Sequence, residues 1–257
     1  MHYFQRLDDT TFQATDHTGG AWNTSEQHIA PSLGLLAHAV ECDRDARRTD
    51  GLRVARISYD ILGTVPVGVV DVAVRVLRPG RSIELVEATL RHAERPVLVL
   101  RAWLMQSFET ASLAATSFAS MPPADDMPAW DPSSIWPGGF IASAQVRRIE
   151  QHPGRAAAWV RTDVRLLKGE AVSSTARAIG LLDISNGLAV RMNPADVAFP
   201  NIDLTAHLFA EPAGEWLGFD TTVSVSATGT GLTHSVIHDE TGPIGVSSQM
   251  LTVRPSR

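Results

Sequence analysis

Two short motifs recur in this chain at nearly the same separation, about 147 residues. The segment Leu33–Leu36 reads Leu-Gly-Leu-Leu, and Ile179–Leu182 reads Ile-Gly-Leu-Leu. The dipeptide Pro96–Val97 likewise returns as Pro243–Ile244. Because two independent motifs agree on one offset, we interpret the chain as an internal duplication, in which both halves fold into the same kind of unit.

Each half contains one helical pattern. In the first half, Pro31 suits the first turn of a helix, and apolar residues then recur at the spacing of one helical face. These apolar residues are Leu33, Leu36, Ala37 and Val40. In the second half, Ser173 or Ser174 can cap a helix, and Asn186–Gly187 supplies its stop. We therefore expect one buried helix per half.

Alternating or β-branched segments follow each helix and predict long antiparallel strands. The clearest are residues 70–76, 83–88, 97–103 and 246–253. The segment Pro122–Pro132 is too rich in proline for a regular element, so we expect it to be a surface linker. These patterns predict an α+β fold with an N-terminal unit at residues 1–121, a linker at 122–133 and a C-terminal unit at 134–257.

Composition narrows the class of protein. With 44% apolar and 19% charged residues, the chain matches a folded globular protein, and its net charge of -6 argues against nucleic-acid binding. Cys42 is the only cysteine, which excludes an intrachain disulfide and a thiolate metal cluster. The sequence has neither an apolar signal-peptide core near Met1 nor a run of about 18 apolar residues for a membrane span. We expect a cytoplasmic protein whose partner is a small molecule.

Several further segments form a pattern across both halves. In the second half they are Phe199–Thr205, Gly214–Leu217 and Gly242–Gln249, and in the first half they are Trp22–Asn23, Gln27–His28 and Pro31. In their order and spacing, these segments resemble TesB-type acyl-CoA thioesterases of the thioesterase-like superfamily. The resemblance covers nearly the whole chain. It implies a double hotdog, that is, two fused antiparallel sheets that each wrap around a helix. It also implies thioester hydrolysis in fatty acid metabolism and a homo-oligomer, such as a dimer.

The resemblance further implies a catalytic trio, in which Asp203, Ser224 and Gln249 hold the attacking water. The chemistry is consistent with such a trio, because hydrolysis needs an activated water and the thiolate leaves without much help from an acid. Alignment of the halves places Arg56 opposite Asp203 and Ala102 opposite Gln249. The shared architecture therefore does not require these polar groups, and we expect them to serve catalysis.

Gln27, His28, Ile29 and Ala30 precede or begin the first helix, and we expect them to bind the substrate. Unpaired backbone N–H groups and the helix dipole favour negative charge at such a position, so one of these amides can stabilise the oxyanion. The site would then span both halves. Related sequences often carry glycine where this chain has Ile29–Ala30, which bears on the size of the substrate.

Two alternative functions remain open. One is an acyl-CoA or acyl-lipid binding protein without turnover, and the other is a hotdog dehydratase or hydratase. The second is weakened because Asp203 and His207 are four positions apart, whereas hydratases of this fold have an Asp and a His five apart. The chain has no Gly-x-Ser-x-Gly elbow, and the pair His234 and His238 lies on a strand, which does not favour zinc. We expect no cofactor and no metal, and a substrate that is an acyl thioester of CoA or of a carrier protein.

Overall fold

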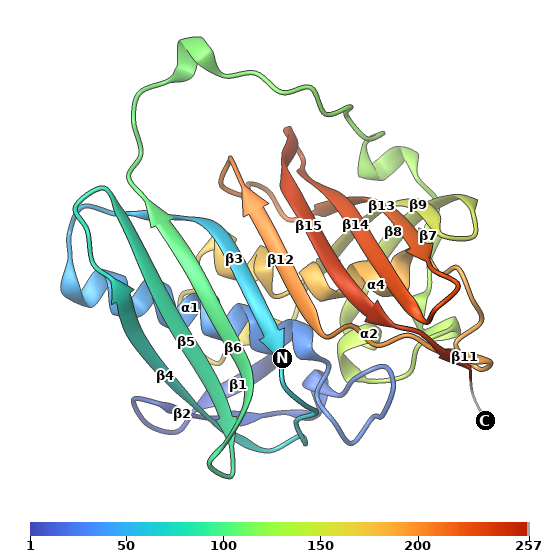
Figure 1. Cartoon of the computed structure of the whole chain (residues 1–257), viewed down its shortest axis with the longest axis horizontal. Helices are drawn as coiled ribbons and strands as arrows, with labels where there is room; N and C mark the ends of the chain where they lie inside the picture. The colour runs from blue at the N-terminus through green and yellow to red at the C-terminus, as the bar shows by residue number, and fades with distance from the viewer. Residues whose placement is uncertain (256–257) are drawn as a thin grey trace.

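The computed structural model describes residues 1–255, and most of its strands form one continuous sheet of 14 strands. Figure 1 shows this sheet as two groups of long strands side by side, with the helices behind them. From one edge to the other, the strand order is β10-β1-β2-β4-β5-β6-β3-β12-β15-β14-β13-β9-β8-β7. A small second sheet pairs β11 with β16.

The first half contains one long helix and six strands. They are β1 (His2–Arg6), β2 (Thr11–Ala14), α1 (Ile29–Arg47), β3 (Arg53–Ile61), β4 (Val69–Arg78), β5 (Ile83–His92) and β6 (Arg95–Met105), with the 3-10 turn η1 (Asp16–Thr18) before the helix. The strands predicted at 70–76, 83–88 and 97–103 are confirmed as β4, β5 and β6. The helix predicted from the apolar spacing is confirmed as α1, with Pro31 in its first turn.

The second half has the same main order, two strands, a helical segment and four long strands, with additional short elements. Its elements are α2 (Gly139–Ser143), β8 (Ala144–His152), β9 (Arg155–Thr162), β10 (Arg165–Leu167), α3 (Ser174–Ile179), η5 (Leu182–Ile184), α4 (Ser185–Leu188), β11 (Val197–Ala198), β12 (Asp203–Leu208), β13 (Leu217–Val225), β14 (Thr230–Asp239), β15 (Gly242–Thr252) and β16 (Arg254–Pro255). Strands β5 and β6 correspond to β14 and β15 at a constant offset of 147 residues, as the duplication predicts.

The two halves meet where β3 pairs with β12 in antiparallel register. Asp203 lies opposite Asp60 at one end of this ladder, and His207 lies opposite Arg56 at the other. An offset of 147 residues converts the first pair into the second, so an approximate two-fold axis passes through the centre of the ladder. The duplicated units are therefore joined edge to edge within one chain.

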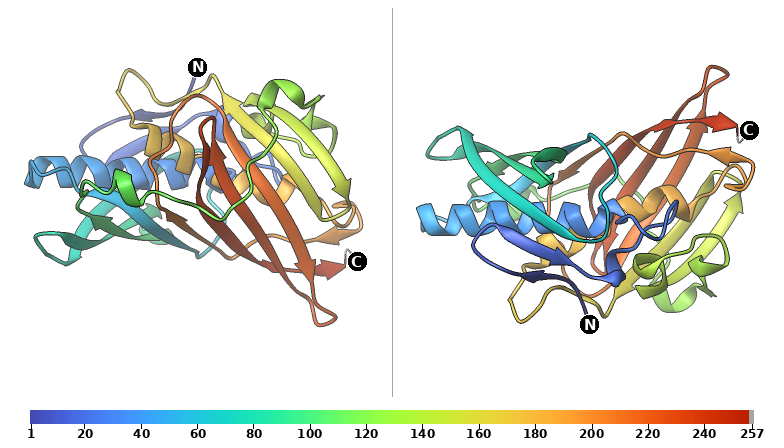
Figure 2. Two further views of the ribbon diagram at one scale, coloured as in Figure 1. Left: turned by 90° about the horizontal axis from the view of Figure 1, so that it is seen from above. Right: turned by 90° about the horizontal axis from the view of Figure 1, so that it is seen from below.

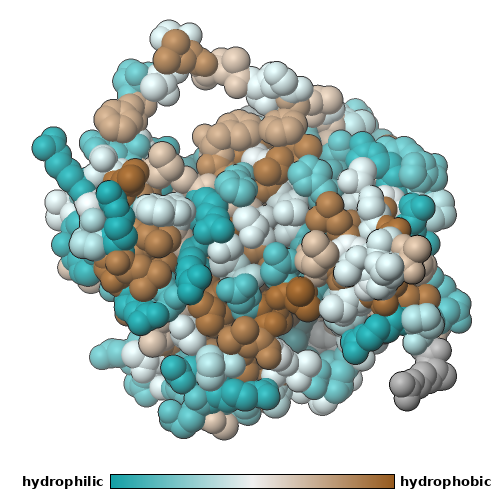
Figure 3. Space-filling view, in the orientation of Figure 1, coloured by the Kyte–Doolittle hydropathy of each residue, from teal (hydrophilic) through white to brown (hydrophobic). Residues whose placement is uncertain are grey.

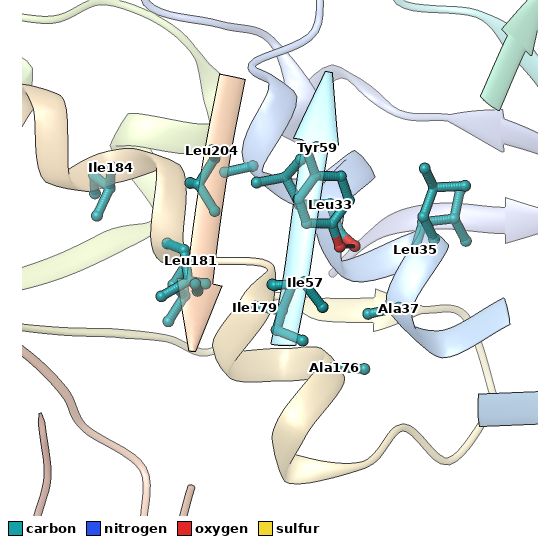
Figure 4. Close-up of a cluster of buried hydrophobic side chains, with 14 of the residues drawn as sticks. Leu33, Leu35, Ala37, Ile57, Tyr59, Ala176, Ile179, Leu181, Ile184 and Leu204 are labelled. Atoms are coloured by element: carbon teal, nitrogen blue, oxygen red, sulfur yellow. Dashed lines mark hydrogen bonds between the residues drawn. The ribbon is translucent and has the colours of Figure 1, made fainter. Parts of the chain in front are cut away.

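The core fills the space between the sheet and the helices. Figure 2 shows α1 crossing the inner side of the strands, where it contacts β4, β5 and β6 as well as α3. Leu33, Leu36 and Val40 are fully buried on this face. Figure 4 shows that apolar side chains from α1, α3, β3 and β12 meet here, and the Tyr59 hydroxyl donates to the Leu33 carbonyl. One core thus serves both halves.

Two expectations about the second half and the linker were wrong. The second helix is not continuous, since α3, η5 and α4 follow one another, and Asn186 and Gly187 lie inside α4 instead of ending the helix. Ser173 is its cap, because the Ser173 Oγ accepts from the Ala176 amide. The segment Pro122–Pro132 also contains regular structure, including a strand that pairs with β8. The elements near it are η2 (Ala111–Leu113), η3 (Ala124–Asp126), β7 (Ala129–Trp130) and η4 (Pro132–Ser134).

The connection between the halves begins at residue 106, directly after β6, and forms an arch that stands away from the body of the molecule in Figures 1 and 3. Residues 106–120 are exposed along their whole length, whereas the predicted linker at 122–133 contains the buried residues Met127 and Pro132. The unit boundaries at 121 and 134 stay a prediction. Among residues 1–255, the structure contains no helix long and apolar enough to cross a membrane.

Candidate active site

A cavity of about 470 Å³ lies between the two halves. The first half contributes the loop that leads into α1 and the segment 61–65 after β3, while the second half contributes Trp136, Asp183 and Asn201. Most of the lining is apolar, and the acidic Asp183 is only 7% exposed. Burial of a carboxyl group in an apolar cavity costs free energy, and such groups are concentrated at functional sites. Asp183 is therefore the starting point for the site.

Asp183 lies on η5, directly after the repeated motif Ile179–Leu182. Its Oδ1 accepts two hydrogen bonds of 2.7 Å, one from Asn201 Nδ2 and one from Gln249 Nε2. Its Oδ2 accepts none from residues 1–255 and lies 3.6 Å from His28 Nδ1. One carboxylate oxygen is therefore fixed, while the other is available to a molecule in the cavity.

Burial raises the pKa of Asp183 from 3.8 to about 7, and the hydrogen bonds from Asn201 and Gln249 oppose this rise. A carboxyl group with this pKa exchanges its proton near neutral pH, which is the property required of a general base.

Gln249 is 1% exposed, and both the oxygen and the nitrogen of its side-chain amide form hydrogen bonds. The Oε1 atom accepts from Ser185 Oγ at 3.0 Å while Nε2 donates to Asp183. These partners remove the cost of about 1 to 3 kcal/mol that an unpaired buried amide would carry. Gln249 does not line the cavity, so its contact with the cavity passes through Asp183.

Asn201 lies just before β12 and faces the cavity. Its Nδ2 donates both to Asp183 Oδ1 and to the Asp203 carbonyl, at 2.7 and 3.1 Å, which orients the amide. The Asn201 Oδ1 then has no donor among residues 1–255. Asp183 Oδ2 and Asn201 Oδ1 thus both lack a donor among residues 1–255, and both residues line the cavity.

His28 caps α1 from the opposite half. Its Nδ1 accepts from the Ala30 amide at 3.2 Å, and its ring lies against Phe140, with centroids 4.4 Å apart. Burial lowers the pKa of His28 to about 3, so the imidazole is neutral and forms no ion pair with Asp183. Because Nδ1 accepts a hydrogen bond, the single ring proton is assigned to Nε2.

The amides at the start of α1 have different partners. The His28 amide donates to the Thr18 carbonyl, the Ala30 amide donates to the His28 ring, and Pro31 has no N–H. Ile29 lines the cavity, and its amide donates to no acceptor among residues 1–255. Of these amides, that of Ile29 is the one left free.

The structure does not bring the three predicted catalytic residues together. Strand side chains alternate between faces, and Gln249 points inward on β15, whereas Ser224 is exposed on the outer face of β13. Asp203 also lies on the outer side of its strand, where its Oδ1 accepts from the Met250 amide. Gln249 is the only one of the three that contacts the buried acid Asp183.

Three of the four predicted substrate-binding residues, Gln27, His28 and Ile29, line the cavity, whereas Ala30 does not. Sequence reasoning missed Asp183 and Asn201. A signal existed for Asp183, because an acidic residue interrupts a buried apolar pattern where the first half has Ala37. Asn201 lies in the motif Phe199–Thr205, two positions before the predicted Asp203.

Trp22 and Trp136 form an aromatic wall of the cavity, and the ring of Phe199 contacts both without lining the cavity itself. The ring of Trp22 meets those of Trp136 and Phe199 edge to face, with centroids 5.0 and 5.2 Å away. Trp22 comes from the first half and the other two rings from the second, so this wall crosses the boundary between the halves. Within residues 1–255, no group of three His, Cys, Asp or Glu side chains is placed to hold a metal ion.

The fold is a double hotdog, and a cavity with a buried acid lies between its two halves. Two family models match the chain: the acyl-CoA thioesterase N-terminal domain over residues 18–105 and the C-terminal domain over residues 117–253. The chain therefore belongs to the acyl-CoA thioesterase family and is a thioester hydrolase.

Solved structures support the fold. A hot dog fold protein of unknown function from Alicyclobacillus acidocaldarius is 14% identical, with a TM-score of 0.76 over 98% of this chain and 96% of that one. The tesB protein of Mycobacterium avium subs paratuberculosis is 17% identical, with a TM-score of 0.66 over 98% and 96%. The acyl-CoA thioesterase II TesB2 of Mycobacterium marinum is 16% identical, with a TM-score of 0.65 over the same shares. Among curated proteins, no significant match was found.

Proposed function

We propose that this protein hydrolyses acyl-CoA thioesters with a water molecule activated by Asp183. The observation that carries the proposal is the asymmetry of the Asp183 carboxylate. Its Oδ1 is fixed by Asn201 and Gln249, while its Oδ2 is free in the cavity. This assignment replaces Asp203 and Ser224 and keeps Gln249, now as a residue that positions Asp183.

The two free acceptors define how water is held. A water molecule that donates one hydrogen to Asp183 Oδ2 and the other to Asn201 Oδ1 directs its lone pair away from both, toward a carbonyl carbon. Asp183 takes a proton as the C–O bond forms. The carbonyl oxygen becomes an oxyanion opposite the Ile29 amide, at the positive end of the α1 dipole. When the intermediate collapses, the C–S bond breaks and the thiolate leaves.

The low pKa of His28 and the hydrogen bond to its Nδ1 argue against a dehydratase. A dehydratase needs a base that removes a proton next to the carbonyl and an acid that protonates the departing hydroxyl. His28 faces Asp183 across the two halves, but its pKa of about 3 keeps it neutral, and its Nδ1 is already bonded to the Ala30 amide. An imidazole with so low a pKa binds a proton weakly, so His28 is a poor base near neutral pH.

The direct test is free-thiol release from short, medium and long acyl-CoA thioesters, for the wild type beside Asp183→Asn and Asp203→Asn. Asp183→Asn keeps an Oδ1 acceptor for both amides but removes the base, so we expect kcat to fall by roughly a hundredfold to ten-thousandfold. Asp203→Asn should stay within a few-fold of the wild type. The reverse ranking would refute Asp183 as the base.

The same assay separates the alternatives. If no variant releases thiol, yet acyl-CoA binds, the protein is an acyl-CoA binding protein. If the product remains a thioester, now enoyl or hydroxyacyl, the protein is a dehydratase or hydratase. The cytoplasmic location, the role in fatty acid metabolism, the dimer and the choice between CoA and a carrier protein stay predictions.

A further inference from the structure

We propose that the side chain of His28 is itself a catalytic residue: its neutral imidazole donates the Nε2–H to the carbonyl oxygen of the thioester, beside the amide of Ile29. This inference rests on the proposed function and deepens it. A neutral imidazole in this role polarises the carbonyl without transferring a proton.

The orientation of the ring supports this role. The Ala30 amide donates to Nδ1, which leaves the proton on Nε2, and the ring of Phe140 packs against the imidazole and restricts its rotation. Gly20 lies so close to the His28 backbone that a β-carbon there would be 2.5 Å from the His28 nitrogen. The loop before α1 therefore packs closely on the backbone of His28, while the Ala30 amide and Phe140 hold its ring.

The donor is also unused. His28 lines the cavity, and Nε2 contacts no acceptor among residues 1–255. The side chain of His28 is 11% exposed, so this donor is open to the cavity and available to an acceptor there. The acid that faces His28 from the other half is Asp183, and its Oδ2 lies nearest to Nδ1. Asp183 and His28 thus line one cavity from opposite halves.

The chemical consequence is a two-donor oxyanion hole. In the proposed hydrolysis, negative charge appears on the carbonyl oxygen when water attacks, and two preorganised donors, Ile29 N–H and His28 Nε2–H, stabilise it more than one does. The ring proton stays on Nε2 throughout, so the reaction balances without proton transfer to or from His28. The low pKa suits this role, because the ring does not titrate in the working pH range.

The test compares two substitutions that separate capping from donation. His28→Asn keeps a side-chain acceptor that can cap α1 but lacks a donor at the Nε2 position. His28→Gln places an amide N–H close to that position. We expect His28→Asn to lower kcat by about a hundredfold to a thousandfold with a smaller change in KM, and His28→Gln to recover part of this loss. His38→Asn, on the same helix but outside the cavity, controls for the loss of a histidine and should leave kcat unchanged.

A spectroscopic readout is independent of turnover. A CoA analogue in which a methylene replaces the thioester sulfur, labelled with ¹³C at the carbonyl, can be followed by isotope-edited infrared difference spectroscopy. We expect its carbonyl stretch to lie at lower frequency on the wild type than on His28→Asn. Equal frequencies on both proteins, or an equal loss of kcat in the Asn and Gln variants, would overturn the proposal. The infrared result stands even if the wild type fails to release thiol, so it is separable from failure of the proposed hydrolysis.

Discussion

Gly34 of α1 packs backbone against backbone on Gly180 at the end of α3: a β-carbon on Gly34 would lie 2.9 Å from the Gly180 Cα and 2.9 Å from the Ala176 carbonyl oxygen. These are the glycines of the repeated motifs Leu33–Leu36 and Ile179–Leu182. The repeat that reveals the duplication in the sequence is therefore also where the helices of the two halves touch.

Gly34→Ala should destabilise the protein, because the added methyl group meets backbone atoms that cannot move away. Overpacking of this kind costs about 1 to 3 kcal/mol, and thermal unfolding measures it. The matched control is Gly68→Ala, since a β-carbon there would meet nothing within 4 Å. Equal melting temperatures for the two variants would show that the helices can separate without cost.

The pH dependence of hydrolysis should follow the ionisation of Asp183. The carboxylate is the active form, so kcat/KM should rise with pH, pass half its maximum near pH 7 and then level off. His28 should add no second step between pH 5 and 8, because its pKa is about 3. Initial rates of thiol release from pH 5 to 9 test this, and a flat profile would contradict the assignment of the base.

Asp183 should make the folded state less stable as the pH rises. Its pKa is about 7 in the folded protein and near 3.8 in the unfolded chain, so unfolding releases a proton between these values and stability falls from about pH 4 to about pH 7. Asp183→Asn removes this loss and should be more stable than the wild type at pH 8, by no more than roughly 4 kcal/mol. Denaturant unfolding at pH 4 and pH 8 compares the two, and a stability difference that does not grow with pH would contradict the raised pKa.

Gln249→Ala should shift the pH profile as well as lower the rate. The Gln249 amide donates to the charged form of Asp183, so its removal raises the pKa of Asp183 further and moves the rise in kcat/KM to higher pH. The comparison is Ser185→Ala, which leaves Gln249 in place but removes the donor to its Oε1. A drop in rate without a shift would mean that Gln249 acts by packing alone.

Much of the fold could be predicted from the sequence because it depends on local patterns. Apolar spacing defined α1, and alternation defined β4, β5 and β6. The second helix was predicted less accurately, because a sequence pattern that resembles one continuous helix forms three short elements, α3, η5 and α4. This division places Asp183 on the short turn η5, where it reaches Asn201 and Gln249.

The residues of the candidate site were only partly predictable because a motif does not reveal which side of a sheet a side chain faces. The sequence predicts Gln249, which contacts the buried acid Asp183. Within the Phe199–Thr205 motif it predicts Asp203, whereas the structure places Asn201 at the cavity. Asp203 and Ser224 lie on the outer face, whereas Gln249 lies on the inner one. A shift of one position in a strand moves a side chain to the opposite face.

The sequence by itself determined that this chain is a duplicated helix-and-sheet unit of the thioesterase type, because the repeat, the hydrophobic periods and the family motifs are all local features. Only the tertiary structure decided which polar residues form the site. Asp183, Asn201 and Gln249 lie on three separate segments, and His28 comes from the other half. They meet because the β3–β12 pairing joins the halves around an approximate two-fold axis, which places the start of one unit's helix opposite the acid of the other.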